Sequence, residues 1–172
     1  MKRVLTLLFC AGMALTAQQL RRAPGFALPD AITGQIRDLY DYRGKAVVLE
    51  FMMTTCPHCA AFAEILGEVH QKYPDRVEVI SIANTNTDNP ATVKQYAAGH
   101  KVGYLILFDM GQMEYSYVQK PTVDLPHVYV IDANGYIRSD FGYGIMSHDI
   151  FEGRGLFTEI DRALNAVNSS KK

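Results

Sequence analysis

Two cysteines separated by two residues are the part of this sequence best suited to chemistry. Cys56 and Cys59 flank a proline and His58, at the point where an apolar run gives way to a helical pattern. Unpaired backbone amides at a helix N-terminus favour a thiolate, and a thiolate is the species that attacks a disulfide. Cys59 lies one helical turn beyond Cys56, close enough to resolve a mixed disulfide. The spacing therefore predicts thiol–disulfide exchange, with protonated His58 as a second group that stabilises the thiolate.

An acidic residue inside an apolar run is the second candidate. Glu50 lies six residues before Cys56, in the segment VVLEFMM. A carboxyl group buried in a strand is costly to ionise, so its pKa should rise, and a carboxyl that titrates near neutrality can carry a proton. We therefore expect Glu50 to deprotonate Cys59 during resolution. The alternative is an acid at a strand end that reaches solvent or Lys45.

A proline directly before an apolar strand is the third candidate. Pro126 precedes the segment 127–131, and an X-Pro bond in that position can be cis. A cis proline frees the backbone of Leu125 to pair with an extended substrate peptide. From the residues alone an ordinary trans bond is as reasonable, and Pro121 competes for the same role.

Alternating strand and helix patterns surround these residues. The run 46–53 (AVVLEFMM) predicts a strand buried on both faces, and 56–73 predicts a helix with Pro57 in its first turn. We expect a central mixed β-sheet flanked by helices, that is, one α/β domain over residues 18–172. The other expected elements are a lead-in arm over 18–30, a short hairpin near 34–39, strands at 77–83, 104–108, 127–131 and 136–141, helices at 90–98 and 149–167, and one short helix at most within 109–126.

Composition and charge limit the class of protein. The 172 residues are 48% hydrophobic and 20% charged, which is ordinary for a folded globular domain. A net charge of −1 gives no electrostatic reason to expect nucleic acid or an anionic membrane as a partner. Three cysteines are too few for a disulfide-rich scaffold.

Residues 1–17 have the pattern of a signal peptide. A basic start, Lys2 and Arg3, precedes an uncharged, mostly apolar stretch that ends at the small residue Ala17. This stretch is shorter than the roughly 20 residues of a membrane span, and an uncleaved N-terminal anchor is the alternative. Cleavage would remove Cys10 and leave a single cysteine pair in an oxidising compartment. We therefore expect a periplasmic or secreted protein, tethered if the segment is retained.

The segments VLEFMMTTCPHC and DLPHVYVIDANGYI resemble the thioredoxin-like superfamily. The frame GQIRDLYDYRGKAVVLEF and the end VYVIDANGYIRSDFGYG are similar to the exported TlpA/ResA-like thiol–disulfide oxidoreductases, a redoxin branch, over about residues 24–167. This resemblance implies a thioredoxin fold with a strand–helix insertion before the strand that follows the cis proline. It implies protein thiols or disulfides as substrates, a membrane or periplasmic redox partner, and no metal or organic cofactor. It assigns Cys56 as nucleophile, Cys59 as resolving thiol, Glu50 as buried acid and Pro126 as the cis proline beside the disulfide.

Three features depart from that branch. Thr55 stands where an aromatic residue usually precedes the first cysteine, and Leu125 stands where a small or β-branched residue is usual; both are candidates for substrate contact. The dipeptide Pro57-His58 is the one seen in DsbA-like oxidases. Residues between the cysteines tune the reduction potential from about −270 mV to about −120 mV, so the direction of electron flow stays open.

Other kinds of site fit the sequence less well. A zinc site usually needs a second cysteine pair, and a structural disulfide closing so short a loop would constrain the unfolded chain little. A peroxiredoxin would place threonine or serine, and then proline, where Met53 and Glu50 stand. A Cu(I)-binding chaperone could use Cys56, Cys59 and His148, although such proteins usually space the cysteines by three. The peroxidase and the copper chaperone are the two alternatives to the oxidoreductase.

Overall fold

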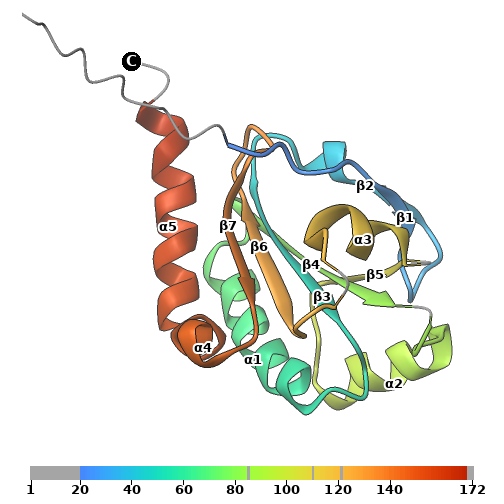
Figure 1. Ribbon diagram of the computed structural model, residues 1–172. Coiled ribbons are helices and arrows are strands. Elements are labelled where there is room, and N and C mark those ends of the chain that lie inside the picture. The colour runs from blue at the N-terminus through green and yellow to red at the C-terminus, as the bar shows by residue number, and fades with distance from the viewer. Residues whose placement is uncertain (1–19, 85, 110, 121, 170–172) are drawn as a thin grey trace, which may run out of the picture.

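The computed structural model describes residues 20–84, 86–109, 111–120 and 122–169 (Figure 1). The predicted signal peptide and Cys10 lie outside these residues. In chain order the elements are β1 (Ala27–Pro29), β2 (Ile36–Asp38), η1 (Leu39–Tyr42), β3 (Ala46–Met52), α1 (Pro57–Lys72), β4 (Val77–Asn84), α2 (Pro90–Gly99), β5 (Leu105–Asp109), α3 (Gln112–Val118), β6 (His127–Ile131), β7 (Ile137–Gly142), η2 (Ile145–Ser147), α4 (His148–Phe151) and α5 (Arg154–Ser169).

The strand that leads to the cysteines is the centre of the main sheet. The strand order is β5-β4-β3-β6-β7, with β4 and β5 parallel to β3 and β6 antiparallel to it. Every residue of β3 is buried, because strands flank it on both sides and helices or the N-terminal arm cover both faces. The predicted mixed sheet and the predicted burial of both faces of this strand are therefore confirmed.

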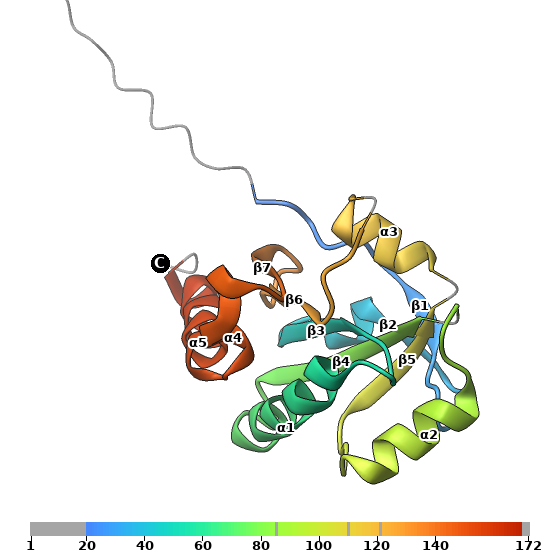
Figure 2. The same cartoon turned by 60° about the horizontal axis from the view of Figure 1, so that its bottom comes forward.

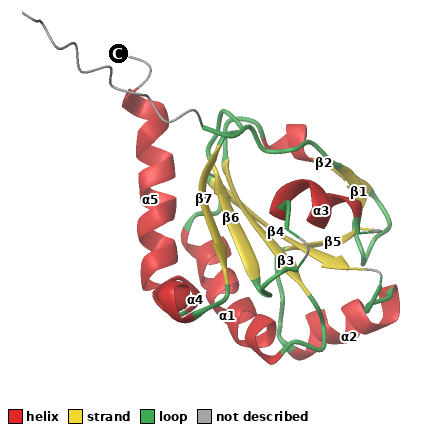
Figure 3. Cartoon of the chain, in the orientation of Figure 1, coloured by secondary structure: helices red, strands yellow, loops and turns green. Residues whose placement is uncertain are grey.

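Helices cover the two faces of the sheet unequally (Figures 2 and 3). On one face, Phe62 of α1 and Leu156 of α5 pack against Val48 of β3. On the other face, Tyr117 of α3 packs against Leu49 of β3. Side chains alternate along a strand, so the even-numbered residues of β3, Glu50 included, lie on the face covered by α1. The elements β5 and α3 separate α2 from β6, which is the strand–helix insertion that the resemblance implied.

The closing helix differs from the prediction. Residues 149–167 are not one helix: α4 ends at Phe151 and α5 starts at Arg154. Gly153 breaks the helix with φ +95°, a left-handed conformation that side chains disfavour. A Cβ at Gly153 would also lie 3.2 Å from the Ile65 side chain. The break therefore lets the chain turn where it passes close to α1.

The lead-in arm is more ordered than predicted. It contains β1, which pairs antiparallel with β2, so the hairpin partner of β2 lies before residue 30 and not within 34–39. Asp30 holds the connecting loop, because its side chain accepts hydrogen bonds from the backbone N–H groups of Ile32 and Thr33 at 2.8 and 3.1 Å. The prolines of the arm hid this pairing from a search for periodicity.

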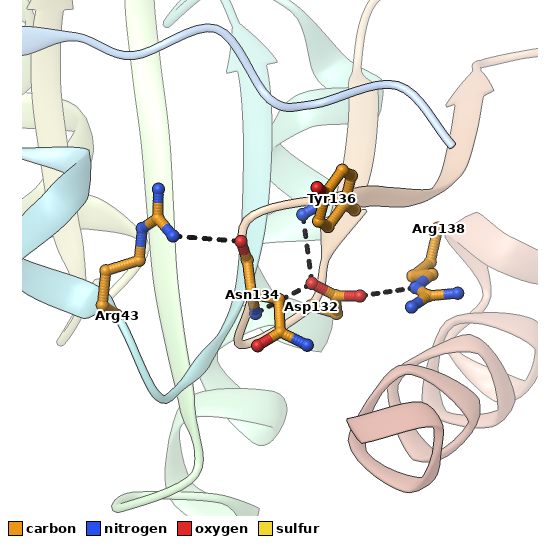
Figure 4. A network of polar contacts seen from close by, with 5 residues as sticks. All are labelled: Arg43, Asp132, Asn134, Tyr136 and Arg138. Atoms are coloured by element: carbon orange, nitrogen blue, oxygen red, sulfur yellow. Dashed lines mark hydrogen bonds and ion pairs between the residues drawn. The ribbon is translucent and has the colours of Figure 1, made fainter. Parts of the chain in front are cut away.

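The turn between β6 and β7 is fixed by a buried carboxylate (Figure 4). Asp132 accepts hydrogen bonds from the backbone N–H groups of Asn134 at 2.9 Å and Tyr136 at 3.0 Å. Its other oxygen pairs with Arg138 Nε at 2.6 Å. Arg43 Nη1 donates to the Asn134 carbonyl at 3.0 Å, which ties the turn before β3 to this one. The β6–β7 turn is therefore held both by Asp132 within it and by Arg43 from the turn before β3.

The N-terminal arm joins the domain at that turn. The Ala23 N–H donates to the Gly135 carbonyl at 3.0 Å, and the Ile137 N–H donates to the Arg21 carbonyl at 2.8 Å. In the antiparallel pairing of β6 with β3, His127 lies opposite Phe51, so β6 starts at the end of the sheet from which the chain leaves β3 for α1. The arm thus enters at one end of the sheet, and the first turn of α1 lies at the other (Figure 1).

Candidate active site

Both cysteines lie at the N-terminus of α1, as the spacing predicted. Cys56 is the N-cap residue and is half-buried, whereas Cys59 in the first turn is fully buried, and both are free thiols. Pro57 fits the first helical position because the proline nitrogen has no N–H to leave unpaired. The backbone N–H of Cys59 donates to Cys56 Sγ at 3.4 Å. Cys56 is therefore the thiol of the pair that another molecule can reach.

Glu50 lies on the face of β3 that α1 covers. The side chain is 1% exposed, and its Oε2 accepts a hydrogen bond from the Ser81 hydroxyl of the neighbouring strand β4. Burial raises the pKa of Glu50 to about 8, and the hydrogen bond from Ser81 limits the rise. The predicted burial and the predicted shift are confirmed. The alternative partner, Lys45, instead pairs with Glu78 at 3.5 Å, so that interpretation is wrong.

The Cys59 thiol resists ionisation. Burial raises the pKa of Cys59 well above its usual range, and the charge of Glu50 raises it further. The Tyr96 hydroxyl donates to the Cys59 backbone carbonyl at 2.9 Å and so fixes the first turn of α1 from the side of α2. Because this thiol holds its proton so firmly, it needs a nearby base before it can attack a disulfide. Glu50 is a buried carboxyl group whose charge acts on this thiol, and its predicted role as the base for Cys59 stays a prediction.

The segment before β6 lies against the accessible cysteine. The Leu125–Pro126 peptide bond is cis, as the resemblance implied, and the Leu125 carbonyl lies 3.9 Å from Cys56 Sγ. The Tyr143 N–H donates to the carbonyl of the buried Pro126 at 3.0 Å, which joins this segment to the loop after β7. Leu125 is half-buried beside the thiol, and its contact with substrate stays a prediction. Pro121, the competing candidate, lies outside the described residues.

His58 makes an aromatic contact that the sequence did not suggest. Its exposed ring stacks on the ring of Tyr143, with centroids 4.1 Å apart and planes at 21°. Together with Phe151 these rings line a shallow pocket at the edge of the site. A stabilising role of His58 toward the Cys56 thiolate stays a prediction. Tyr143 was indistinguishable in the sequence from other strand-end tyrosines.

The turn before Cys56 is held by a carboxylate that sequence reasoning missed. Asp88, 4% exposed in the loop between β4 and α2, accepts hydrogen bonds from the backbone N–H of Thr54 at 3.2 Å and from the Thr54 hydroxyl. Thr55 is exposed next to Cys56 and lines an open groove with Tyr96. Contact of Thr55 with substrate stays a prediction. A buried acid in a polar loop has no periodic signal that would have revealed Asp88.

The chain matches the AhpC/TSA family over residues 20–140. It belongs to the AhpC/TSA family. Two curated relatives of this family member are the thioredoxin-like protein YneN of Bacillus subtilis and the thiol-disulfide oxidoreductase ResA of Bacillus thuringiensis subsp. konkukian. YneN is 26% identical over 131 residues, 76% of this chain and 74% of YneN. ResA is 28% identical over 119 residues, 68% of this chain and 65% of ResA, so the chain spans less than two thirds of that relative.

A solved structure shows the same fold as this AhpC/TSA protein. A Chlorobium tepidum protein assigned as the thiol:disulfide interchange protein DsbE superposes with a TM-score of 0.72 over 84% of this chain and 96% of that chain, at 22% identity. The predicted thioredoxin fold is thereby confirmed. The resemblance to TlpA/ResA-like redoxins, stated from the sequence, is also confirmed by the named relatives.

The copper alternative needs a third ligand beside the cysteines. Within the described part of this AhpC/TSA protein, no group of three or more His, Cys, Asp or Glu side chains is placed to hold a metal ion. His148 instead pairs with Glu152 at 3.3 Å. The described residues therefore do not assemble the site that Cys56, Cys59 and His148 were considered to form.

Proposed function

We propose that this protein is an exported thiol–disulfide oxidoreductase that exchanges disulfides with protein substrates through Cys56 and Cys59. The observation that carries the proposal is an accessible thiol at a helix N-terminus, with a buried thiol one turn later above a buried carboxyl group. The curated relative named thiol-disulfide oxidoreductase supports the same chemistry.

In the reducing direction the reaction has two steps. The Cys56 thiolate attacks a substrate disulfide, forms a mixed disulfide and releases one substrate sulfur as a thiolate. Cys59 then gives its proton to the Glu50 carboxylate and attacks Cys56 Sγ. The Cys56–Cys59 bond forms, the second substrate sulfur leaves, and two electrons have passed to the substrate. In the oxidising direction the same steps run backwards, and protonated Glu50 returns the proton to Cys59 as it leaves.

Substrate would approach across the rim around Cys56. Leu125 offers its backbone beside the thiol, and an extended peptide can hydrogen-bond to such a segment. Thr55 on one side and the stacked rings of His58 and Tyr143 on the other border the approach. These side chains are small or planar, which leaves room for a protein surface to reach the sulfur.

Export and tethering fit the placement of the N-terminal arm. The arm joins the domain at the β6–β7 turn, at the end of the sheet away from Cys56 (Figure 1). A retained leader would therefore direct the cysteines away from the membrane and toward soluble partners. Within the described residues, no helix is long and apolar enough to cross a membrane. A membrane or periplasmic redox partner restores the starting redox state of the cysteine pair after each cycle.

The proposal is tested by reduction of insulin with the unchanged protein and with Cys56→Ser. Loss of turnover in Cys56→Ser is expected, because the accessible nucleophile is gone, whereas Cys10→Ser, made in a chain that keeps its leader, should retain full activity as the matched control. Retained reduction by Cys56→Ser would contradict the proposal. Equilibration with glutathione buffers then gives the direction: a potential near about −120 mV marks an oxidase and one near or below about −250 mV a reductase. Turnover of hydrogen peroxide would instead favour the peroxidase.

A further inference from the structure

Three polar side chains share one buried face of the sheet below α1. In the parallel register of β3 with β4, Glu50 lies directly opposite Ser81. Ser81 in turn lies opposite Ile106 of β5, and Tyr104 comes two residues before Ile106. Tyr104 directly precedes β5 and packs against the core cluster that contains Val48 of β3 and Phe62 of α1, so it lies on the face of the sheet that carries Glu50. The three thus come from β3, β4 and the residue before β5, in order from the central strand toward the sheet edge.

The two oxygens of Glu50 have different surroundings. Oε2 accepts the hydrogen bond from Ser81, whereas Oε1 is buried and has no hydrogen-bond partner within the described part of the chain. An unpartnered buried acceptor is costly unless it serves a purpose. Oε1 is free to take the proton of Cys59, whose thiol responds to the charge of Glu50. The bond from Ser81 to Oε2 places the Ser81 hydroxyl within reach of the same carboxyl group.

Glu50 must lose the proton that it takes from Cys59 before it can act again. Each cycle that leaves a proton on Glu50 must release it before the carboxylate can act again, and Glu50 is 1% exposed. Ser81 is equally buried, at 1%. Tyr104 is half-buried as a residue, so it is the most exposed of the three. Hydroxyl groups both donate and accept hydrogen bonds, and can therefore pass a proton in either direction.

We propose that Ser81 and Tyr104 form the path along which protons pass between Glu50 and solvent. This inference rests on the proposed function. In the reducing direction, Cys59 gives its proton to Oε1 of Glu50. The protonated carboxyl group then rotates so that Oε1 faces Ser81 and gives this proton to Ser81 Oγ, Ser81 gives its own to the Tyr104 oxygen, and Tyr104 releases one to water. The proton count is conserved, and each hydroxyl ends in its original state.

Other groups around Glu50 fit this path and do not compete with it. Burial raises the pKa of Tyr104 and the charge of Glu50 adds to the rise, whereas hydrogen bonding with Ser81 acts in the opposite direction, so the three groups sense one another. Tyr96 of α2 also lies near Glu50, but its hydroxyl already donates a hydrogen bond to the Cys59 carbonyl. Across the sheet, β6 offers only Val128 opposite Glu50. The thiols of Cys56 and Cys59 complete the titratable groups facing it from α1.

The test follows two signals in one stopped-flow reaction of the reduced full chain. A chromogenic aryl disulfide releases one coloured thiolate when Cys56 attacks and a second when Cys59 resolves, and a pH-indicator dye reports protons. At about pH 9, one unit above the pKa of Glu50, the carboxylate takes the Cys59 proton and then releases it. The unchanged protein should release the second thiolate and this proton together.

Tyr104→Phe and Ser81→Ala should delay the proton behind the second thiolate by about 10²-fold, the lower end of what a positioned proton-transfer group contributes. Ser81→Thr keeps a hydroxyl and should restore simultaneous release, which a merely structural role would not explain. Tyr73→Phe is the matched control, because it also removes a hydroxyl, one bonded to Asp161 at the other end of α1.

Simultaneous release of thiolate and proton in both Tyr104→Phe and Ser81→Ala would overturn the path while leaving the exchange reaction intact. Absence of a second thiolate from the unchanged protein would instead mean that the proposed function fails. Tyr104→Phe preserves the ring and its packing, so the test survives if Ser81→Ala does not fold.

Discussion

Replacing Glu50 with glutamine should abolish a fall in stability between about pH 5 and pH 8. Glu50 is fully buried, and its pKa rises from 4.5 to about 8 on folding. Between these values the folded protein binds one more proton than the unfolded chain, so the free energy of unfolding decreases as pH rises. The contribution is complete below about pH 4.5 and is lost once the pH passes about 8.

The size of this effect follows from the span of the shift. A span of about 3.5 pH units at about 1.4 kcal/mol per unit gives about 5 kcal/mol. Glutamine keeps the shape of the side chain and an oxygen for the Ser81 hydroxyl, but it does not titrate. The Glu50→Gln variant should therefore gain stability relative to the unchanged protein by about 1.4 kcal/mol for each unit of rising pH.

Urea unfolding of both proteins, held reduced by a phosphine, measures this difference at half-unit steps of pH. Glu78→Gln is the matched control, because Glu78 lies on β4 with its side chain paired to Lys45 rather than enclosed. Groups that titrate alike in both proteins cancel in the comparison. Parallel stability curves for Glu50→Gln and the unchanged protein, within about 1 kcal/mol over this range, would refute the argument that burial controls this carboxyl group.

Two further predictions concern the reaction and the scaffold. Glu50→Gln should slow release of the second aryl thiolate by about 10²-fold and remove the inflection near pH 8, because Cys59 loses its base; an unchanged pH profile in stopped flow would contradict this role. Asp132→Ala should lower the free energy of unfolding by about 3 kcal/mol, because Arg138 and two backbone N–H groups lose their partner; urea unfolding at pH 7 checks it, with replacement of the exposed Asp75 by alanine as control, and a loss below about 1 kcal/mol would contradict a stabilising role of this turn.

Local sequence patterns were sufficient to predict where Glu50 and Cys56 lie in the fold. The apolar run around Glu50 predicted its burial, because a strand covered on both faces leaves its side chains no route to solvent. The change from that run to a helical pattern placed Cys56 at the helix N-terminus, where the structure has it. Each inference needed only residues within about one turn or strand of one another.

Features that depend on pairing between distant segments were not predictable in the same way. The contact of Ser81 with Glu50, 31 positions apart in the sequence, depends on the register of two strands, although a polar residue within the otherwise apolar stretch VISIA was a signal for it. The buried position of Asp88 depends on how a loop folds over the turn at Thr54. The split of the closing helix depends on the close approach of Gly153 to Ile65, which no helical periodicity reveals.

The central claim is that Cys56 attacks and Cys59 resolves. Mass spectrometry of Cys59→Ser and Cys56→Ser after incubation with a cysteine-containing peptide disulfide tests it most directly, with peptide mapping to locate the adduct. The account predicts that Cys59→Ser accumulates a stable mixed disulfide at Cys56, because the buried resolving thiol is gone. It predicts no adduct in Cys56→Ser, since Cys59 is fully buried. An adduct on Cys59, formed as fast as the one on Cys56, would contradict the assignment.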